Sequence, residues 1–199
     1  MRVLYNLLTY LLLIPFLVYW LVRGIGNRDY FDRLGQRFGF GLPELERSIW
    51  VHAVSVGEVQ AAAPLVRALA ERFPQHEILV TTVTPTGAAR VKALFGDTVH
   101  HAYVPFEFPH AVKALFRRTR PSAALVMETE IWPNLYRGCG VRGIPLILVS
   151  ARISPKSIPG YRKLLPLIRE TLSHGIIIAS QSQQDADRFL SLGANPERT

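Results

Sequence analysis

Short apolar runs alternate with helical patterns along the chain from Ser48 onward. The predicted strands are Ile49–Val54, Ile78–Val83, Val99–Val104, Ala123–Met127, Leu146–Val149 and Gly175–Ala179. The predicted helices are Ala62–Arg72, Pro85–Leu94, Pro109–Arg118, Ile131–Cys139, Tyr161–Thr171 and Gln183–Leu192. This alternation predicts an α/β fold, a Rossmann-like and mostly parallel sheet with helices on both faces. Near-continuous apolar runs such as residues 145–149 support strands that are buried on both sides.

The amino-terminal segment has a different pattern. Residues 3–22 carry no formal charge, and their number matches the length that a helix needs to cross hydrocarbon. We expect residues 1–23 to form a membrane-anchor helix. The arginines that follow place the rest of the chain in the cytoplasm by the positive-inside rule. A helix lying in one leaflet and a buried helix of a soluble protein are the alternatives.

Two further regions follow this anchor. Residues 24–47, rich in glycine and arginine, are interpreted as a juxtamembrane connector with a short helical piece around Tyr30–Phe38. Residues 48–199 form the predicted Rossmann-like domain.

Charge and cysteine content narrow the function classes. The 199 residues include 23 Lys and Arg against 15 Asp and Glu, a net charge of +8. This balance favours anionic partners such as nucleic acid, phosphorylated metabolites or acidic lipid surfaces. The single cysteine, Cys139, excludes an internal disulfide and a metal site built from cysteines, which fits a reducing compartment. The adjacent pair His100 and His101 is interpreted as structural or surface histidine, since neighbours in a strand point to opposite faces.

The first candidate site follows the first predicted strand. Ser55-Val-Gly-Glu58 stands where this strand meets a helix, and open α/β sheets bind ligands beyond the carboxyl ends of their strands. Gly57 suits a tight turn with positive φ that would project Glu58 into a crevice. The alternative is a first-turn glutamate stabilised by the helix dipole. Because of Pro64, the helix either begins near Ala61, leaving Glu58 on a loop, or has irregular first turns.

A second pair of carboxylates follows the fourth predicted strand. In extended chain Glu128 and Glu130 would share one face, and burial or mutual repulsion would raise the pKa of one of them. The alternative is a capped helix start with Pro133 near its first turn. Glu128 lies closer to the strand end and is the better functional candidate.

Two more strand ends carry groups that suit an anion. The first is the segment of residues 81–87, which includes Thr84, Pro85, Thr86 and Gly87. Thr84 is predicted to cap a helix with Pro85 at its first position, and the free N–H groups of this helix can bind phosphate or carboxylate. In residues 150–155, Ser154 is predicted as a cap. Its neighbour Arg152 is a candidate anion ligand, because arginine binds carboxylate or phosphate through two N–H groups.

Several common site motifs are absent. The chain has no Gly-x-Gly-x-x-Gly after its first strand, no Gly-Lys-Ser/Thr loop and no Gly-x-Ser-x-Gly elbow. The dinucleotide fingerprint, the phosphate-binding loop of nucleotide hydrolases and the common hydrolase triad are therefore excluded.

Four ordered motifs, together with the apolar amino terminus, carry a family resemblance. They are Ser55-Val-Gly-Glu58, Thr81-Thr-Val-Thr-Pro-Thr-Gly87, Met127-Glu-Thr-Glu-Ile-Trp-Pro-Asn134 and Ala151-Arg-Ile-Ser154. The chain resembles, over essentially its whole length, the amino-terminal half of 3-deoxy-D-manno-octulosonic acid (Kdo) transferases.

The resemblance implies a two-domain GT-B glycosyltransferase on the cytoplasmic face of the inner membrane of Gram-negative bacteria. Such an enzyme transfers Kdo, with inversion, from CMP-Kdo to the lipid A precursor, and requires neither a metal nor another cofactor. Nucleic acid is not among its partners.

The resemblance also implies site residues. Glu58 takes the position of the general base and Glu128 that of a transition-state stabiliser, while the role of Glu130 stays open. The remaining candidates for acceptor or anion binding are Ser55, Gly57, Thr84, Thr86, Gly87, Glu130, Arg152 and Ser154.

The chain ends where the alternation would continue with another strand. By resemblance, the CMP-binding residues and a further catalytic lysine lie in a carboxyl-terminal half outside these residues. We therefore expect the 199 residues to bind acceptor without catalysing transfer unaided. The alternatives are another membrane-associated GT-B glycosyltransferase, for example one that uses a UDP-sugar, and a non-catalytic membrane-anchored lipid-binding module.

Overall fold

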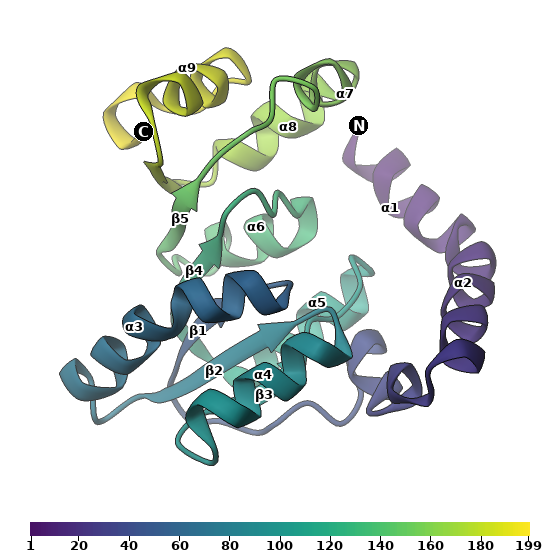
Figure 1. Cartoon of the computed structure of the whole chain (residues 1–199). Helices are drawn as coiled ribbons and strands as arrows, with labels where there is room; N and C mark the ends of the chain where they lie inside the picture. Colours follow the sequence, from purple (N-terminus) through teal and green to yellow (C-terminus); the bar gives the residue numbers. More distant parts are fainter.

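Six parallel strands form one sheet in the order β3-β2-β1-β4-β5-β6 (Figure 1). The computed structural model describes all residues from 1 to 199. The strands are β1 (Ser48–His52), β2 (Glu77–Thr82), β3 (His100–Tyr103), β4 (Pro121–Met127), β5 (Leu146–Ala151) and β6 (Ile177–Ser180). The predicted parallel sheet is confirmed, with every predicted strand present.

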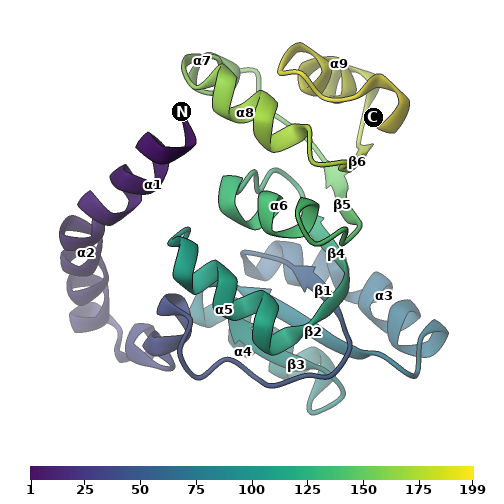
Figure 2. The same cartoon turned by 180° about the vertical axis from the view of Figure 1, so that it is seen from behind.

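Helices cover both faces of this sheet. The α-helices are α1 (Arg2–Leu11), α2 (Leu13–Gly26), α3 (Val56–Arg72), α4 (Pro85–Phe95), α5 (Pro109–Thr119), α6 (Pro133–Gly140), α7 (Ile158–Lys163), α8 (Leu165–Leu172) and α9 (Gln183–Ser191). The 3-10 helices are η1 (Arg28–Phe31), η2 (Leu34–Phe38) and η3 (Pro196–Arg198). Helices α3 and α4 lie in front of the sheet in Figure 1, whereas α5 and α6 come to the front in the opposite view (Figure 2).

Alternate side chains of the central strands enter two separate cores. Trp50 of β1 belongs to a cluster of 25 buried residues that includes side chains of α5, α6, α8 and α9. Ile49 and Val51 belong to a cluster of 14 buried residues with α3 and α4. This division follows from the period of two in a strand, which places successive side chains on opposite faces.

Two helix predictions need correction. The predicted helix over 161–171 is two helices, α7 and α8, which meet at Leu164, two residues before Pro166. Pro166 lies in the first turn of α8, where a missing N–H costs no helical hydrogen bond. Helix α3 begins at Val56 and contains Pro64, so the predicted start near Ala61 is wrong.

The predicted single anchor helix over residues 1–23 is not confirmed, because the segment forms two helices that bend by 46°. Neither helix alone has the length and hydropathy to span a bilayer. Pro15, in the first turn of α2, explains the break: its ring has no N–H and clashes with the carbonyl four residues earlier, at Leu11.

Helices α1 and α2 curve along one side of the domain, the side toward which the arrowhead of β2 points (Figure 1). One face of this pair contacts the domain: Arg2 pairs with Glu170 of α8, and the Tyr10 hydroxyl lies 2.9 Å from His110 Nδ1. The aromatic rings of Phe16 and Trp20 pack on Phe106. The other face exposes Val3, Leu4, Leu7, Leu8, Leu11, Ile14, Val18, Leu21, Val22 and Ile25.

A buried arginine joins α2 to the sheet. The Arg37 guanidinium lies 4.0 Å from the ring centroid of Trp20 and 4.3 Å from that of Tyr103, and its Nη2 donates to the Val83 carbonyl at 2.6 Å. Burial lowers the pKa of Arg37 to about 10. The group therefore keeps its charge at neutral pH, and the two rings and one carbonyl provide its compensation.

Arg37→Lys is expected to lower the free energy of unfolding by about 2 kcal/mol, because a lysine ammonium cannot stack as a plane between two rings in a desolvated site. Urea unfolding measures the loss. Arg33→Lys is the matched control, since Arg33 lies over the same Tyr103 ring at 5.0 Å but is more exposed. A larger loss for Arg33→Lys than for Arg37→Lys would contradict this account.

The neighbouring histidines confirm the structural interpretation. His100 is exposed and lies 3.1 Å from Glu77, whereas His101 Nε2 lies 2.9 Å from the Thr82 hydroxyl. A third histidine, His52, is fully buried at the end of β1 with its Nδ1 2.8 Å from Thr81 Oγ1. Burial lowers the pKa of His52 to about 4 and that of His101 to about 3.

These depressed pKa values predict acid destabilisation. As pH falls below about 6.5 the unfolded chain protonates its histidines while folded His52 stays neutral, so stability present above that pH is lost progressively down to about pH 4. The loss from His52 alone is about 3 kcal/mol. Urea unfolding between pH 7 and 4 should therefore show a flatter pH dependence for His52→Asn, which keeps an acceptor for Thr81. The exposed-site control His100→Asn should keep the wild-type slope, and an unchanged slope in His52→Asn would refute this source.

Candidate active site

The candidate site lies where β1 and β4 are neighbours. Chain order reverses between these strands: β2 and β3 extend to one side of β1, and β5 and β6 to the other side of β4. Helices on opposite faces follow the two strands, and this arrangement opens a crevice beyond their carboxyl ends. Glu58 follows β1, and Glu128 and Glu130 follow β4, so the fold brings the predicted carboxylates to one place.

Glu58 lies in the first turn of α3, three residues after the cap Ser55. Its Oε2 accepts the Val54 N–H at 2.8 Å, and its Oε1 accepts the Ser55 hydroxyl at 2.9 Å. In return, Ser55 Oγ accepts the Glu58 N–H at 3.4 Å. This reciprocal arrangement is a variant of the capping box, in which the glutamate accepts the N–H of Val54 in place of that of the cap Ser55. The side chain is half-buried, so its position is fixed while solvent still reaches it.

Gly57 does not adopt the predicted turn. Its φ is not positive, because it occupies the first turn of α3 together with Glu58. A Cβ on Gly57 would meet only Ser55 Oγ, at 3.9 Å. The glycine therefore leaves open space above the cap instead of shaping a turn, and Glu58 owes its position to the helix.

Glu128 directly follows β4 and has a left-handed conformation with φ of 56°. This conformation costs a residue other than glycine roughly 1–2 kcal/mol. The predicted extended geometry, in which Glu128 and Glu130 share one face, is therefore wrong. Oε2 of Glu128 accepts from Nε and Nη2 of Arg152 at 3.1 and 2.9 Å. Arg152, predicted as an anion ligand, thus has a protein carboxylate as its partner.

Glu130 is half-buried beside Trp132 and Tyr136. Its Oε2 accepts the indole N–H of Trp132 at 2.6 Å, and its carbonyl accepts the Tyr136 hydroxyl at 2.8 Å. Burial raises the pKa of Glu130, the Trp132 hydrogen bond opposes this shift, and the negative charges of Glu58 and Glu128 raise the pKa further. The expectation that one pKa of the pair rises is confirmed. Glu130 therefore lies within electrostatic reach of both Glu58 and Glu128.

The predicted cap at Thr84 is confirmed. Its Oγ1 accepts the Gly87 N–H at 3.0 Å, with Pro85 at the first helical position, and the Thr86 hydroxyl donates to the same oxygen at 3.2 Å. A Cβ on Gly87 would lie 3.3 Å from the Val54 carbonyl. Gly87 therefore lets α4 start close to the end of β1. Anion binding at this terminus remains a prediction.

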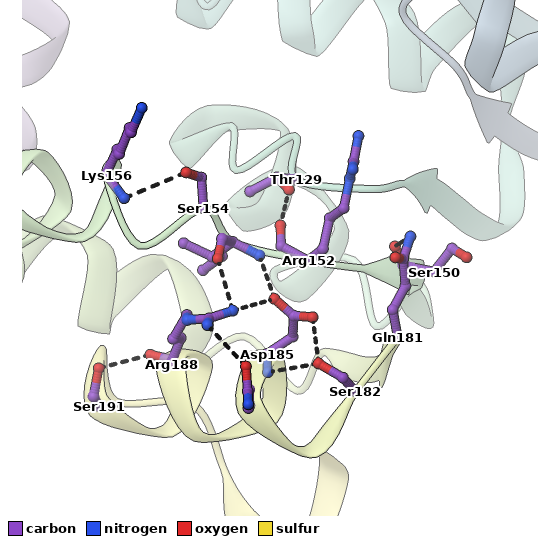
Figure 3. Close-up of polar contacts among 12 residues, drawn as sticks. Thr129, Ser150, Arg152, Ser154, Lys156, Gln181, Ser182, Asp185, Arg188 and Ser191 are labelled. Atoms are coloured by element: carbon purple, nitrogen blue, oxygen red, sulfur yellow. Dashed lines mark hydrogen bonds and ion pairs between the residues drawn. The ribbon is translucent and has the colours of Figure 1, made fainter.

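Ser154 does not cap a helix. Its hydroxyl accepts the Lys156 N–H at 3.3 Å within a turn (Figure 3), and α7 begins after Ser157. The Arg152 side chain extends from the same segment, away from the polar cluster around Asp185 (Figure 3). The segment therefore positions Arg152 through a turn.

Asp185 holds this segment and was not among the predicted site residues. It accepts the Ile153 N–H at 3.1 Å, the Ser182 hydroxyl at 2.6 Å and Arg188 Nη1 at 2.8 Å (Figure 3). These donors, with the Ser182 hydroxyl first, lower its pKa. The spacing of Ser182 and Asp185 matches the capping-box pattern, which is the sequence signal that identifies them.

Glu107 is a second residue absent from the predictions. Only 7% of it is exposed, and its carboxylate accepts the N–H groups of Asn134 and Leu135 at 2.6 and 3.0 Å and the Tyr5 hydroxyl at 3.0 Å. Burial raises its pKa to about 7, although these donors oppose the shift. The available sequence signal is a lone glutamate between Phe106 and Phe108.

A family model described as 3-deoxy-D-manno-octulosonic-acid transferase (kdotransferase) matches residues 32–199. The chain belongs to this family. A 3-deoxy-D-manno-octulosonic acid transferase of Haemophilus influenzae is 40% identical over 173 residues, which are 85% of the chain and 40% of that protein. One from Bordetella pertussis is 40% identical over 157 residues, 76% of the chain and 36% of that protein. The predicted resemblance to Kdo transferases is confirmed.

The Kdo transferase relatives are longer than this chain, which spans about two-fifths of their length. Among solved structures, a UDP-N-acetylglucosamine 2-epimerase has a TM-score of 0.53 at 17% identity, covering 79% of the chain and 45% of the epimerase. That likeness shows a shared fold.

Proposed function

We propose that this Kdo transferase chain is the acceptor-binding half of an inverting glycosyltransferase that moves Kdo from CMP-Kdo to the lipid A precursor in lipopolysaccharide core biosynthesis. The observation that supports the proposal most directly is the position of Glu58. Its carboxylate is half-buried at the switch point of the sheet, close enough to Glu130 for their charges to interact, and Glu130 in turn interacts with Glu128.

An inverting transfer is a single displacement at the anomeric carbon of Kdo. The acceptor hydroxyl oxygen forms a bond to the anomeric carbon. At the same time the bond from this carbon to the phosphate oxygen of CMP breaks, and CMP leaves with the bonding electrons. The hydroxyl proton passes to Glu58. In inverting glycoside hydrolases a carboxylate base takes the proton of the attacking water in the same way. The hydrogen bonds from Val54 and Ser55 hold Glu58 in one orientation for this step.

Glu128 supplies negative charge near the reacting carbon. The transition state of glycosyl transfer carries developing positive charge on the sugar ring, and a fixed carboxylate stabilises such charge without reorganisation. Arg152 fixes the orientation of this carboxylate through two N–H groups. We assign no step to Glu130.

We further propose that α1 and α2 bind the cytoplasmic surface of the inner membrane. A large exposed apolar surface is typical of a protein or membrane interaction site, and Arg23, Arg28 and Arg33 suit anionic head groups. The polar residues of α1 face the domain, which favours a pair lying in the interface over one that crosses the bilayer. Thr84, Thr86, Gly87 and Ser154 remain proposed contacts of the phosphorylated acceptor.

The test uses the complete protein in detergent with CMP-Kdo and the lipid A precursor. We expect a mass increase of the acceptor by one or more Kdo units, inhibited by CMP and not by UDP at equal concentration. Inhibition by UDP alone, with transfer from a UDP-sugar, would support the alternative glycosyltransferase. The same reaction with the 199-residue chain alone is expected to give no product.

A further inference from the structure

A buried carboxylate joins three segments that lie far apart in the sequence. Glu107 comes from the loop between β3 and α5, Tyr5 from α1, and Asn134 and Leu135 from α6. The hydrogen bonds measure between 2.6 and 3.0 Å. The Asn134 side chain adds two more, to the Glu107 carbonyl at 2.7 Å and to Asn6 of α1 at 2.9 Å.

Helix α6 depends on Glu107 for its cap. Its N-cap residue is Trp132, whose side chain makes no capping hydrogen bond. The Glu107 carboxylate instead accepts the N–H groups of the second and third helical residues, which is the role of a capping side chain. A negative charge at this end of the helix also interacts favourably with the helix dipole. The start of α6 is therefore fixed by a residue from another loop.

The segment held in this way carries Glu128, one of the two candidate catalytic carboxylates, together with Glu130. The loop of residues 128–132 runs from the end of β4 to the start of α6. At its end, Trp132 donates to Glu130, and Tyr136 in the first turns of α6 holds the Glu130 carbonyl. A shift of the α6 terminus would therefore move Trp132 and Glu130 together.

Trp132 also faces α1 and α2 across a cavity of about 250 Å³. The helices contribute Tyr5, Thr9, Leu12 and Phe16 to its lining, and the domain contributes Phe106, Glu107, Phe108 and Trp132. The amino-terminal helices and the loop of the site thus line the same cavity, and Glu107 lines it as well.

We propose that Glu107 is a positioning residue that joins α1 to the start of α6 and thereby holds the loop of residues 128–132 in its catalytic geometry. Docked α1 is then part of the support of the active site, in addition to its role at the lipid surface. This inference rests on the proposed function for its kinetic consequence, while its structural consequence can be measured without turnover.

The test compares three variants of the complete protein. Tyr5→Phe removes the hydroxyl that donates a hydrogen bond to the Glu107 carboxylate. Glu107→Gln replaces one carboxylate oxygen by an amide NH₂, which cannot accept a hydrogen bond from the N–H groups of α6. Tyr10→Phe is the matched control, because its hydroxyl lies on the same helix but contacts His110 instead. We expect kcat to fall ~10-fold in Tyr5→Phe and up to ~10²-fold in Glu107→Gln, as small displacements of catalytic groups do. The KM for CMP-Kdo of Tyr5→Phe and Glu107→Gln should stay within about twofold of wild type. The kcat of the control Tyr10→Phe should also stay within about twofold of wild type.

A second measurement follows the ¹⁵N-labelled indole N–H of Trp132, assigned with Trp132→Phe. Its signal should shift in Tyr5→Phe and Glu107→Gln and stay in place in Tyr10→Phe. If the Trp132 signal stays in place in Tyr5→Phe and Glu107→Gln and both variants keep the wild-type kcat, the positioning role is overturned. A rise in the acceptor KM of these variants without a fall in kcat would also overturn it. Shifted signals in a protein that transfers no sugar would support the positioning role and refute the proposed function. If Glu107→Gln does not fold, Tyr5→Phe decides the outcome.

Discussion

Replacing Glu58 by glutamine in the complete protein is expected to slow sugar transfer by ~10²–10⁴, the usual contribution of a general base. Glutamine cannot remove the proton of the acceptor hydroxyl at neutral pH. Its amide oxygen can still accept a hydrogen bond from Val54, and its size matches that of glutamate. The free energy of unfolding and acceptor binding should therefore change little. Initial rates at saturating CMP-Kdo, urea unfolding and acceptor binding on vesicles measure the three quantities.

The capping box makes this comparison necessary, because a structural role alone already explains where Glu58 lies. Ser55→Ala is the matched control: it removes the capping hydroxyl, lowers helix stability by about 1 kcal/mol and keeps the carboxylate. We expect Ser55→Ala to lose far less transfer activity than Glu58→Gln, because the Val54 N–H still holds the carboxylate. Equal transfer rates for wild type and Glu58→Gln would leave Glu58 as a helix cap and refute its role as general base.

The fold could be predicted from the sequence because each strand has its own local signal. Leu146–Val149 reads as a doubly buried strand whatever its neighbours do. The exact helix starts depended on competing rules. Pro64 argued against a helix over residues 56–72, yet α3 includes it, since tertiary packing of Val59, Ala62 and Val66 on the sheet outweighs one lost hydrogen bond.

The candidate site could be predicted only in part, for a similar reason. Glu58, Glu128 and Arg152 stand at strand ends, so the topology alone brings them to one edge of the sheet. The conformation of Glu128 could not be read from the sequence, because a positive φ in a glutamate reflects its surroundings and not its residue type. Glu107 was missed because its partners, Tyr5 and Asn134, are distant in the sequence and meet only in the folded chain.

The amino-terminal segment shows how composition and geometry can disagree. A charge-free run of twenty residues satisfies the length rule for a spanning helix, but Pro15 divides it and Tyr5 and Asn6 turn toward the domain. Hydropathy averages over the faces of a helix, so it cannot register that one face makes polar contacts with protein while the other exposes leucine and valine.

Glu128→Gln is expected to lower kcat by ~10²–10³, the cost of removing one preorganised electrostatic group from a transition state. Glutamine keeps an oxygen for Arg152 but loses the charge. Glu128→Gly provides a folding control: glycine accepts a φ of 56° without strain, so this variant should be at least as stable as wild type while equally slow. Loss of stability together with rate in Glu128→Gly would contradict this reading of the strained conformation.

Arg152 completes this experiment through a double-mutant cycle. Nε and Nη2 of Arg152 both donate to the same oxygen of Glu128. We therefore expect Arg152→Gln to act through that carboxylate. Arg152→Gln alone should lower kcat by less than Glu128→Gln, and the double variant should be no slower than Glu128→Gln. Additive losses, with a raised acceptor KM in every variant that lacks Arg152, would instead mean that the guanidinium leaves Glu128 and binds a phosphate of the acceptor.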